Sequence, residues 1–474
     1  MIALALILIP LLFGLITLVV KDTIAKPIAL FSTLASLIMT GMGCYLHYSK
    51  SQLNLLDFQY FLGGTKGLLL FFSLGNIGLS MVLLSNLLFP ILFLYHNSSA
   101  VKNNNAFLGL LLLIQAGLNG LFMAEDVIMF YLMFELGLVP AYLLVGIWGK
   151  GENSANISFK FFVYTLFGSL LMLVGIIYMI VQTGPAHATD FGNIIRFCSK
   201  LPLETQFWLS GLFLLAFMIK MPMFPFHTWQ PGTYNAAPTT VTIVLSALMA
   251  KMGVYGLMRF NYQVLPQAFH ELQPYLMTLS IVGVIYGAVI AIQQNNLKKL
   301  LAFSSISHMA LMVAGICSAT VIGVQGAVIQ MFNHGIIICG LLLMVESIYQ
   351  RTGTYDLSEL GGLAKIAKRL AIILMVFMMA SVALPLTNGF VGEFMLLNAI
   401  FTYSQIAAVI AGITIIFGAV YMLRMYQKTM YGPLNGKHEQ VVDITLMEVG
   451  VIVPLLIVVI VIGVYPELLN KIIF

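Results

Sequence analysis

WLSGLFLLAFMIKMPMF, residues 208–224, is an apolar segment that contains a single charge, Lys220, and Pro222 and Pro225 follow it closely. An ionisable group at the bilayer centre costs roughly 2.5–3.5 kcal/mol on insertion scales, so it is retained where it faces a polar interior and has a function. Proline removes a backbone donor and blocks the carbonyl four residues earlier. An interrupted helix at membrane depth is tolerated only around a protein-lined cavity. The segment therefore predicts a broken membrane helix beside an ion path.

The composition of the whole chain agrees with a membrane location. Of the 474 residues, 60% are hydrophobic and only 8% are charged, whereas about a quarter of a soluble chain is charged. The first twenty residues have no basic n-region and no small-residue cleavage site, so they are expected to be a retained span rather than a signal peptide. We therefore expect an all-α polytopic membrane protein.

Apolar stretches long enough to cross about 30 Å of hydrocarbon predict about fourteen transmembrane helices. A second interruption lies in ASVALPLTNGFVGEFMLL, residues 380–397, five spans after the first. Broken helices at corresponding positions indicate internal repeats with a midplane ion site, and an odd offset makes the repeats inverted. The expected organisation is three N-terminal spans (1–105), a first inverted five-helix repeat (106–262, broken in span 7), a second (263–431, broken in span 12) and a C-terminal span (432–474).

The basic residues predict an orientation. Most of them fall in loops that follow odd-numbered spans, and by the positive-inside rule these loops face the cytoplasm or matrix. Both termini are then expected on the opposite, periplasmic side of an energy-transducing membrane, most simply a bacterial inner membrane.

Six ionisable side chains occupy apolar spans away from the loop ends. Because burial and neighbouring charges change the proton affinity of carboxylates and amines in opposite directions, such groups can be made to hold or release protons. Histidine titrates near neutrality and passes protons between its two nitrogens. The set predicts a proton relay formed by Glu135, Lys220, Lys251, His308, His334 and Glu393.

Structural alternatives exist for each of these residues. Glu135 and Lys220 could be a static ion pair that joins two spans, although a buried pair is weak evidence for stability. Lys251 could extend its amine to a membrane interface. His308 and His334 could each be core histidines bonded to a backbone carbonyl. Because these residues occur together with other ionisable residues in a set of six, we favour the proton relay.

Other polar residues receive lesser roles. Ser304, Ser305 and Ser307 could hold relay waters or only bond to the preceding helical turn. His227 follows the broken helix and is expected to be structural. Pro231 and Pro238 are expected to bound a polar loop. Arg259 and His270 are expected to be solvated near a membrane surface.

Several stretches resemble the antiporter-like subunits of respiratory complex I, a family that also includes subunits of multisubunit cation/proton antiporters and membrane-bound hydrogenases. The similarity covers most of residues 125–431. The motifs that carry it are FMIKMPMFPFHTWQPGTYNAAPTTVTIVLSALMAKMGVYGLMRF (217–260), KKLLAFSSISHMALMVAGI (298–316), QMFNHGIIICGLLLMVESIYQR (330–351), YDLSELGGLAK (355–365) and LPLTNGFVGEF (384–394).

Glu393 indicates the M-type branch of this family, the homologue of mitochondrial subunit 4, because the L- and N-type subunits resemble it but carry lysine there. The chain also stops at Phe474, where the L-type subunit would continue into a long lateral helix. The resemblance implies a role for each residue: Glu135 and Lys220 as a modulating pair, Lys251 as the central proton carrier, His308 and His334 as connecting groups, and Glu393 as the terminal site.

One loop departs from the family pattern. Many members read PDAHVEAP where this chain reads PGTYNAAP, residues 231–238. This substitution puts in doubt any role of loop carboxylates here.

The resemblance implies a proton-translocating membrane-arm subunit of a proton-pumping NADH:quinone oxidoreductase. Such a chain would have no redox site of its own, and NADH, FMN, iron–sulfur clusters and quinone would bind in partner subunits. The four cysteines have no CxxC or histidine-paired spacing, which predicts neither a metal site nor a cluster. The expected partners are L-like and N-like antiporter subunits, small membrane subunits and lipids, and not nucleic acid.

Two other functions are alternatives, and the first of them would use much the same buried residues. A subunit of a sodium/proton antiporter complex would have no redox partners, and a structural wedge would only space its neighbours in the membrane. Co-purifying flavin and iron–sulfur partners would favour the pump.

Overall fold

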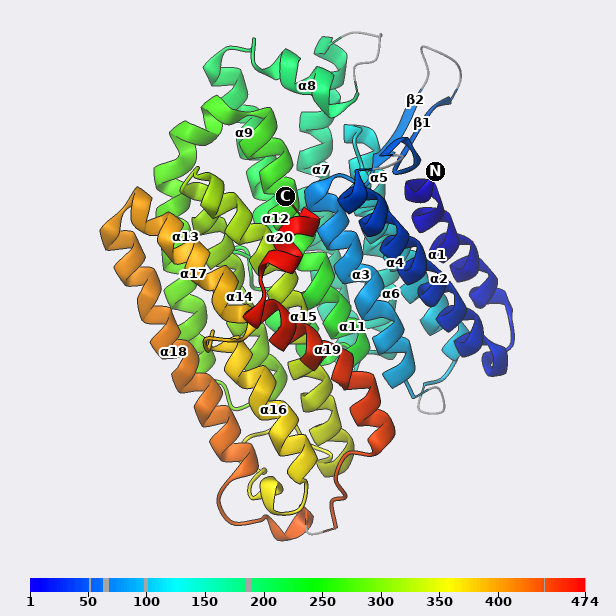
Figure 1. Ribbon diagram of the computed structural model, residues 1–474, viewed down its shortest axis with the longest axis vertical. Coiled ribbons are helices and arrows are strands. Elements are labelled where there is room, and N and C mark those ends of the chain that lie inside the picture. The colour runs from blue at the N-terminus through cyan, green and yellow to red at the C-terminus, as the bar shows by residue number, and fades with distance from the viewer. Residues whose placement is uncertain (51–52, 63–67, 98–100, 184–188, 439, 474) are drawn as a thin grey trace. The chain divides into compact units, whose positions relative to one another are not determined.

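The structure is a computed structural model that describes the chain except for residues 51–52, 63–67, 98–100, 184–188, 439 and 474 (Figure 1). Among the described residues, 13 helical segments are long and apolar enough to cross a membrane. α16 (Lys368–Ser381) and α17 (Asn388–Tyr403) are each shorter than these and lie where the sequence predicts the second interrupted span. The polytopic membrane fold is confirmed and is nearly all-helical. The inverted repeats and their boundaries stay a prediction.

The candidate spans follow the apolar stretches of the sequence. They are α1 (Ile2–Val19), α2 (Asp22–Ser49), α3 (Asn76–Tyr95), α4 (Asn104–Met123), α5 (Val127–Leu136) with α6 (Leu138–Trp148), α7 (Ser154–Thr183), α9 (Leu203–Lys220), α11 (Thr239–Ile243) through η4 (Leu257–Val264), α13 (Pro266–Gln293), α14 (Leu297–Cys317), α15 (Val321–Thr352), α18 (Gln405–Met430) and α19 (Leu446–Val464).

The chain forms two structural units. Unit 1 consists chiefly of Met1–Met221 and Leu248–Gln273, and unit 2 consists of Pro222–Ala247 and Pro274–Asn470. In unit 1, α1 packs along both α2 and α4 (Figure 1). In unit 2, α15 packs against α14, α16 and α17. Each unit therefore has its own helical core.

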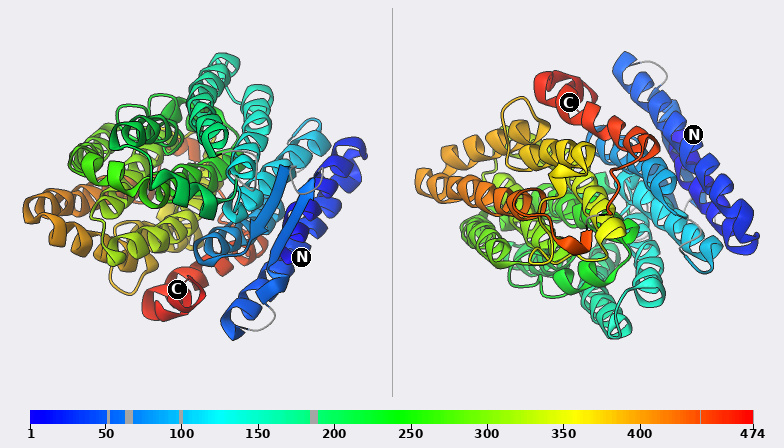
Figure 2. Two further views of the ribbon diagram at one scale, coloured as in Figure 1. Left: turned by 90° about the horizontal axis from the view of Figure 1, so that it is seen from above. Right: turned by 90° about the horizontal axis from the view of Figure 1, so that it is seen from below.

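Unit 1 also contains a β-hairpin that the all-helical expectation does not include. β1 (Asp57–Leu62) pairs antiparallel with β2 (Leu68–Ser73), with Asp57 opposite Ser73 (Figure 2). A short amphipathic helix, α8 (Phe191–Cys198), lies in what the sequence suggests is a polar loop, and the Asp190 side chain caps it. Neither element is long enough to be a span.

Both predicted helix interruptions are present, and proline explains each. α9 ends at Lys220, and Pro222 and Pro225 follow it. α16 ends at Ser381, whose carbonyl is the one that Pro385 leaves without an amide donor. Asn388 begins α17 after a short non-helical segment. The first interruption therefore follows its ionisable residue, Lys220, whereas the second precedes Glu393.

The span that contains Lys251 is irregular throughout. It runs through α11, the π-helix η3 (Val244–Met249), α12 (Ala250–Gly256) and the π-helix η4. Lys251 thus lies in one short α-helical segment between two π-helical ones. π-helical turns are rare and occur frequently at functional sites.

The polar loop that Pro231 and Pro238 were expected to bound is partly helical. α10 (Gln230–Ala236) has Pro231 in its first turn, where the missing amide is no loss, and only Ala237 and Pro238 separate it from α11. The remaining short elements are η1 (Leu53–Leu55), η5 (Leu363–Lys365), η6 (Gly436–His438) and α20 (Glu467–Ile473).

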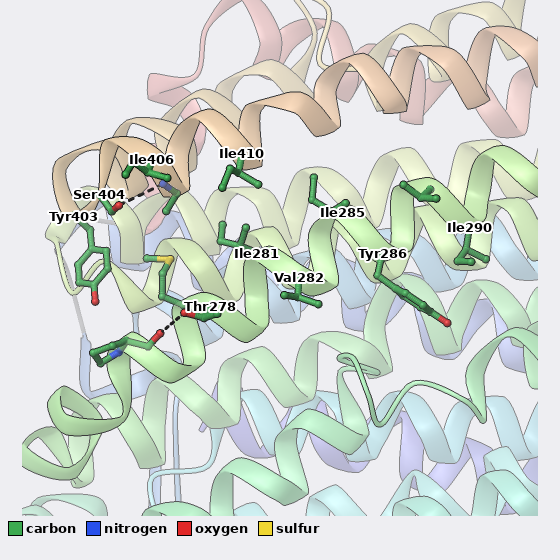
Figure 3. A pocket seen from close by; sticks show the side chains of 14 residues that line it. Thr278, Ile281, Val282, Ile285, Tyr286, Ile290, Tyr403, Ser404, Ile406 and Ile410 are labelled. Atoms are coloured by element: carbon green, nitrogen blue, oxygen red, sulfur yellow. Dashed lines mark hydrogen bonds between the residues drawn. The ribbon is translucent and has the colours of Figure 1, made fainter.

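A groove of about 790 Å³ lies between α13 and α18 in unit 2 (Figure 3). Ile281 and Val282 line it from α13, and Ile406 and Ile410 line it from α18. Its described lining contains no Asp, Glu, Lys, Arg or His. None of the six predicted relay residues therefore lines this groove.

Candidate proton-relay site

The six predicted relay residues divide evenly between the two units. The structure buries Lys220, Lys251, His334 and Glu393 to at least nine-tenths, and it leaves Glu135 and His308 half-buried. Unit 1 contains Glu135, Lys220 and Lys251, and unit 2 contains His308, His334 and Glu393.

In unit 1, Glu135 is the ninth residue of α5 and lies just before an interruption of the span. The Asp126 carboxylate accepts hydrogen bonds from the Ile128 and Met129 amides and fixes where the helix begins. α5 ends at Leu136, because Pro140 has no amide to donate to the Leu136 carbonyl. The Ser169 side chain of α7 interacts with the Glu135 carboxylate, whose Oε1 has no hydrogen-bond partner in the described part of the chain.

Lys220 lies close to Glu135 but does not pair with it. The ion pairs within 4.0 Å among the described residues do not include these two. The Lys220 Nζ lies 4.5 Å from the centre of the Phe134 ring instead, and no hydrogen-bond partner for it is present in the described residues. The two charges are near enough to interact through space. Glu135 and Lys220, which the resemblance implies are a modulating pair, therefore form no ion pair within 4.0 Å in this structure.

Lys251 is fully buried, and its helix packs directly on α9. Close approach requires glycine here: a Cβ on Gly253 would lie 2.7 Å from the Cβ of Met221 and 2.7 Å from the Phe217 carbonyl oxygen. No other residue fits at that separation without movement of a backbone. Gly253 thus sets the position of Lys251 relative to the end of α9, where Lys220 lies.

The expectation that Arg259 is solvated is wrong. Its guanidinium donates to Glu125 over 2.6 Å and stacks over the Phe191 ring at 4.2 Å. These residues are far apart in the sequence, so no local sequence pattern indicates that they are in contact. His270 is exposed, as expected.

In unit 2, His308 and Glu393 are in direct contact. The His308 Nδ1 lies 3.1 Å from Glu393 Oε1, and the centres of the His308 and His334 rings are 5.3 Å apart. The described part of the chain offers no hydrogen-bond partner to His308 Nε2. The histidine therefore has one nitrogen on the carboxylate and the other available to a second proton donor or acceptor.

A pair of asparagines holds the broken span against α15. The Asn333 amide donates to the Asn388 backbone carbonyl over 2.7 Å, and the Asn388 amide donates to Asn333 Oδ1 over 3.2 Å. One turn later, Gly392 leaves space for Gln330, whose amide donates to Glu393 Oε1 over 3.4 Å. These contacts place the Glu393 carboxylate beside His308.

A small cavity of about 10 Å³ adjoins this contact. It is lined by polar groups that include Ser307, His308, Glu393 and Tyr421. Its volume is about that of one water position. The Tyr421 hydroxyl also bonds to Ser304 over 3.0 Å, whereas no hydrogen bond to Ser305 Oγ is found in the described residues.

Sequence reasoning missed Gln330, Asn333, Asn388 and Tyr421. Each is a polar residue inside an otherwise apolar span, so polarity in the motifs QMFNHG and LPLTNG was the available signal. His227 is buried, and its Nε2 lies 3.2 Å from the Tyr286 hydroxyl, as a structural histidine requires. Among the described residues, no three His, Cys, Asp or Glu side chains form a group that could hold a metal ion.

The chain is similar in sequence to proteins of a known family. Residues 124–418 match the family described as NADH:quinone oxidoreductase/Mrp antiporter, TM. NADH-quinone oxidoreductase subunit M of Rickettsia bellii is 39% identical over 359 residues, which are 75% of this chain and 72% of the relative.

Solved structures agree in fold. A chain of respiratory complex I from Thermus thermophilus with bound NADH matches with a TM-score of 0.88 and 29% identity, over 100% of both chains. A chain of the Mrp complex from Dietzia sp. DQ12-45-1b matches with a TM-score of 0.86, over 99% of this chain and 95% of its own, but at 19% identity it shows only the shared fold. The chain belongs to the NADH:quinone oxidoreductase/Mrp antiporter membrane family, and within that family it is similar to subunit M of complex I.

Proposed function

We propose that this chain is a proton-translocating membrane-arm subunit of a proton-pumping NADH:quinone oxidoreductase. The observation that carries the proposal is the buried contact of His308 with Glu393, with His334 beside it. A carboxylate and an imidazole at hydrogen-bond distance can exchange a proton, and a second imidazole can extend the transfer.

Unit 1 would supply the switch. When Lys220 leaves Glu135, its charge acts more strongly on other groups of unit 1, including Lys251. Moving one unit charge from about 4 Å to about 8 Å changes an interaction by roughly 2 kcal/mol at an effective dielectric of 20. A change of that size alters a proton-binding constant about thirtyfold. The open arrangement, in which Lys220 contacts Phe134, is one of the two states that this switch requires.

The proposal assigns the redox chemistry to other chains. NADH, flavin, iron–sulfur clusters and quinone would bind in partner subunits, and this chain would contribute only proton transport. Its neighbours would be other antiporter-like and small membrane subunits, together with lipids. The membrane would be a bacterial inner membrane, with both termini on the periplasmic side.

A cation/proton antiporter subunit is the second candidate, because the family description and one structural relative include Mrp antiporters. The 39% identity to a complex I subunit M favours the pump. Purification of the chain with its native partners separates the two: flavin and iron–sulfur subunits support the pump, and membrane subunits alone support the antiporter.

The test of transport is Glu393→Gln in the assembled complex, reconstituted into vesicles. Glutamine keeps the size and one acceptor atom but cannot exchange a proton, so the number of protons moved per electron should fall. Glu204→Gln, which changes an exposed carboxylate at the start of α9, is the matched control and should leave the ratio unchanged. An unchanged ratio in Glu393→Gln would count against the proposal.

A further inference from the structure

A second group of ionisable residues lies in unit 2, away from His308 and Glu393. Lys298 is in the first turn of α14, and Glu346 is near the end of α15. Tyr355 lies in the loop after α15, and Thr239 is the first residue of α11. Together, Lys298, Glu346, Tyr355 and Thr239 are called the Glu346 cluster below.

The carboxylate of Glu346 has an inner and an outer oxygen. Its Oε2 accepts hydrogen bonds from the Thr239 hydroxyl and from the Tyr355 hydroxyl, the latter over 2.9 Å. Its Oε1 faces the exposed Gln350, whose amide lies 3.5 Å away. The side chain is half-buried, so one oxygen is directed to solvent and the other to the interior.

Tyr355 connects this carboxylate to a buried amine. Lys298 is fully buried, and its Nζ lies 5.1 Å from the centre of the Tyr355 ring and donates to the Ala237 carbonyl over 2.8 Å. A cation over a tyrosine ring is attracted by the ring's quadrupole. Burial and the Glu346 carboxylate raise the pKa of Tyr355 well above its usual range, so the hydroxyl remains a donor.

Backbone pairing holds Tyr355 in place. The Leu297 amide donates to the Tyr355 carbonyl over 2.9 Å, and the Leu357 amide donates to the Asn295 carbonyl over 2.8 Å. The loop after α15 is thus paired with the residues that begin α14. The position of Tyr355 between the two charges is therefore built into the fold.

The same two helices lead from the Glu346 cluster to the histidines. Lys298 is ten residues, or about 15 Å, from His308 along α14, and Glu346 is twelve residues, or about 18 Å, from His334 along α15. Ser305 lies two turns from Lys298 on the same side of α14, and its buried Oγ has no hydrogen-bond partner in the described residues. A buried hydroxyl of this kind is a site for ordered water.

We propose that the Glu346 cluster is a proton-exchange site through which unit 2 takes up or releases protons at the end of α15. A hydronium ion would transfer its proton to the Glu346 carboxylate, forming a neutral carboxyl group and leaving water, and the reverse step would release it. The inference rests on the proposed function and adds a solvent connection to it.

The test is Glu346→Gln in the complete, reconstituted complex. Glutamine can still accept from Thr239 and Tyr355, so the fold is kept while proton exchange is lost. NADH-driven proton uptake should slow on the order of tenfold, less than a positioned acid–base group contributes in enzymes because water replaces part of its function. Added imidazole buffer, a small mobile proton carrier, should restore part of the rate.

Tyr355→Phe is the second variant, since it keeps the ring over Lys298 and removes only the hydroxyl. It should show a smaller slowing in the same direction. Glu359→Gln, at an exposed carboxylate in the same loop, is the matched control and should behave as the unmodified chain does.

The outcomes separate this inference from the proposed function. If the unmodified complex moves no protons, the proposed function fails and the inference with it. If the unmodified complex pumps and Glu346→Gln pumps at the same rate, only the inference fails. Slowing that imidazole does not relieve would indicate a structural role and would also overturn it.

Discussion

Lys220 is the residue on which the account of unit 1 depends. Its buried amine contacts the Phe134 ring and has no hydrogen-bond partner in the described residues. The Oε1 atom of the nearby Glu135 also has no hydrogen-bond partner there. An unpaired buried charge is expensive, whereas a closed pair still bears two desolvation costs. Two arrangements of similar free energy are what a switch requires.

Replacement of this lysine should prevent proton pumping. In the assembled complex, Lys220→Ala removes the movable charge and should abolish turnover that is coupled to proton pumping. Lys200→Ala changes an exposed lysine just before α9 and should have no effect. The measurement is protons moved per electron in reconstituted vesicles, and an unimpaired ratio in Lys220→Ala would remove the switch from the account.

Among the helices of unit 1, α12 packs closely on α9 at Gly253. An alanine Cβ at 253 would lie 2.7 Å from Met221 Cβ, so Gly253→Ala should lower the stability of the chain by about 1–3 kcal/mol through overpacking. Gly211→Ala, also in unit 1, meets nothing within 4 Å and should stabilise α9 by up to about 1 kcal/mol. Thermal denaturation of the purified complex compares the two, and equal effects would contradict the close packing.

Asp126, which caps the start of α5, should make the free energy of unfolding depend on pH. Burial, as the main cause, raises the pKa of Asp126 to about 6. The folded chain therefore binds this proton more tightly than the unfolded chain, so stability falls as the pH rises from about 4 to about 6, by up to about 3 kcal/mol.

Asp126→Asn tests this dependence. Asparagine can still accept from the Ile128 and Met129 amides but carries no charge, so the variant should exceed the unmodified chain in melting temperature at about pH 8 and lose that advantage at about pH 5. A variant that melts lower at both values would show that the carboxylate matters for the cap rather than as a buried charge.

The sequence predicts those elements that local rules govern. Pro222, Pro225 and Pro385 predict both interruptions, because proline acts on the carbonyl four residues earlier. The hairpin was missed although the sequence has a glycine-rich stretch between two apolar runs, which is a common turn signal. The π-helical segments on both sides of Lys251 have no comparable local signal.

The candidate site divides in the same way. The six predicted relay residues were chosen because each is an ionisable side chain within an apolar stretch, and their role as a relay stays a prediction. Their contacts did not follow from the sequence: Glu393 meets His308 across 85 positions, and Arg259 meets Glu125 across 134. Lys220 and Glu135, predicted to be a pair that can open, are not paired in the structure, where Lys220 contacts Phe134. Partners that come from distant segments are decided by packing, which local patterns do not encode.

For the whole molecule, each unit contains three of the six predicted relay residues, and the chain is similar to a subunit of an NADH-quinone oxidoreductase. The account therefore requires that protons cross by way of buried side chains while electrons travel in other subunits. Lys251, fully buried between two π-helical segments, is the residue assigned to carry the proton in unit 1.

The most direct test of this claim is the proton-to-electron ratio of the reconstituted complex with Lys251→Met. Methionine fills most of the same apolar volume but cannot bind a proton, so electron transfer to quinone should continue at a reduced rate with fewer protons moved per electron. A ratio equal to that of the unmodified complex would contradict the account.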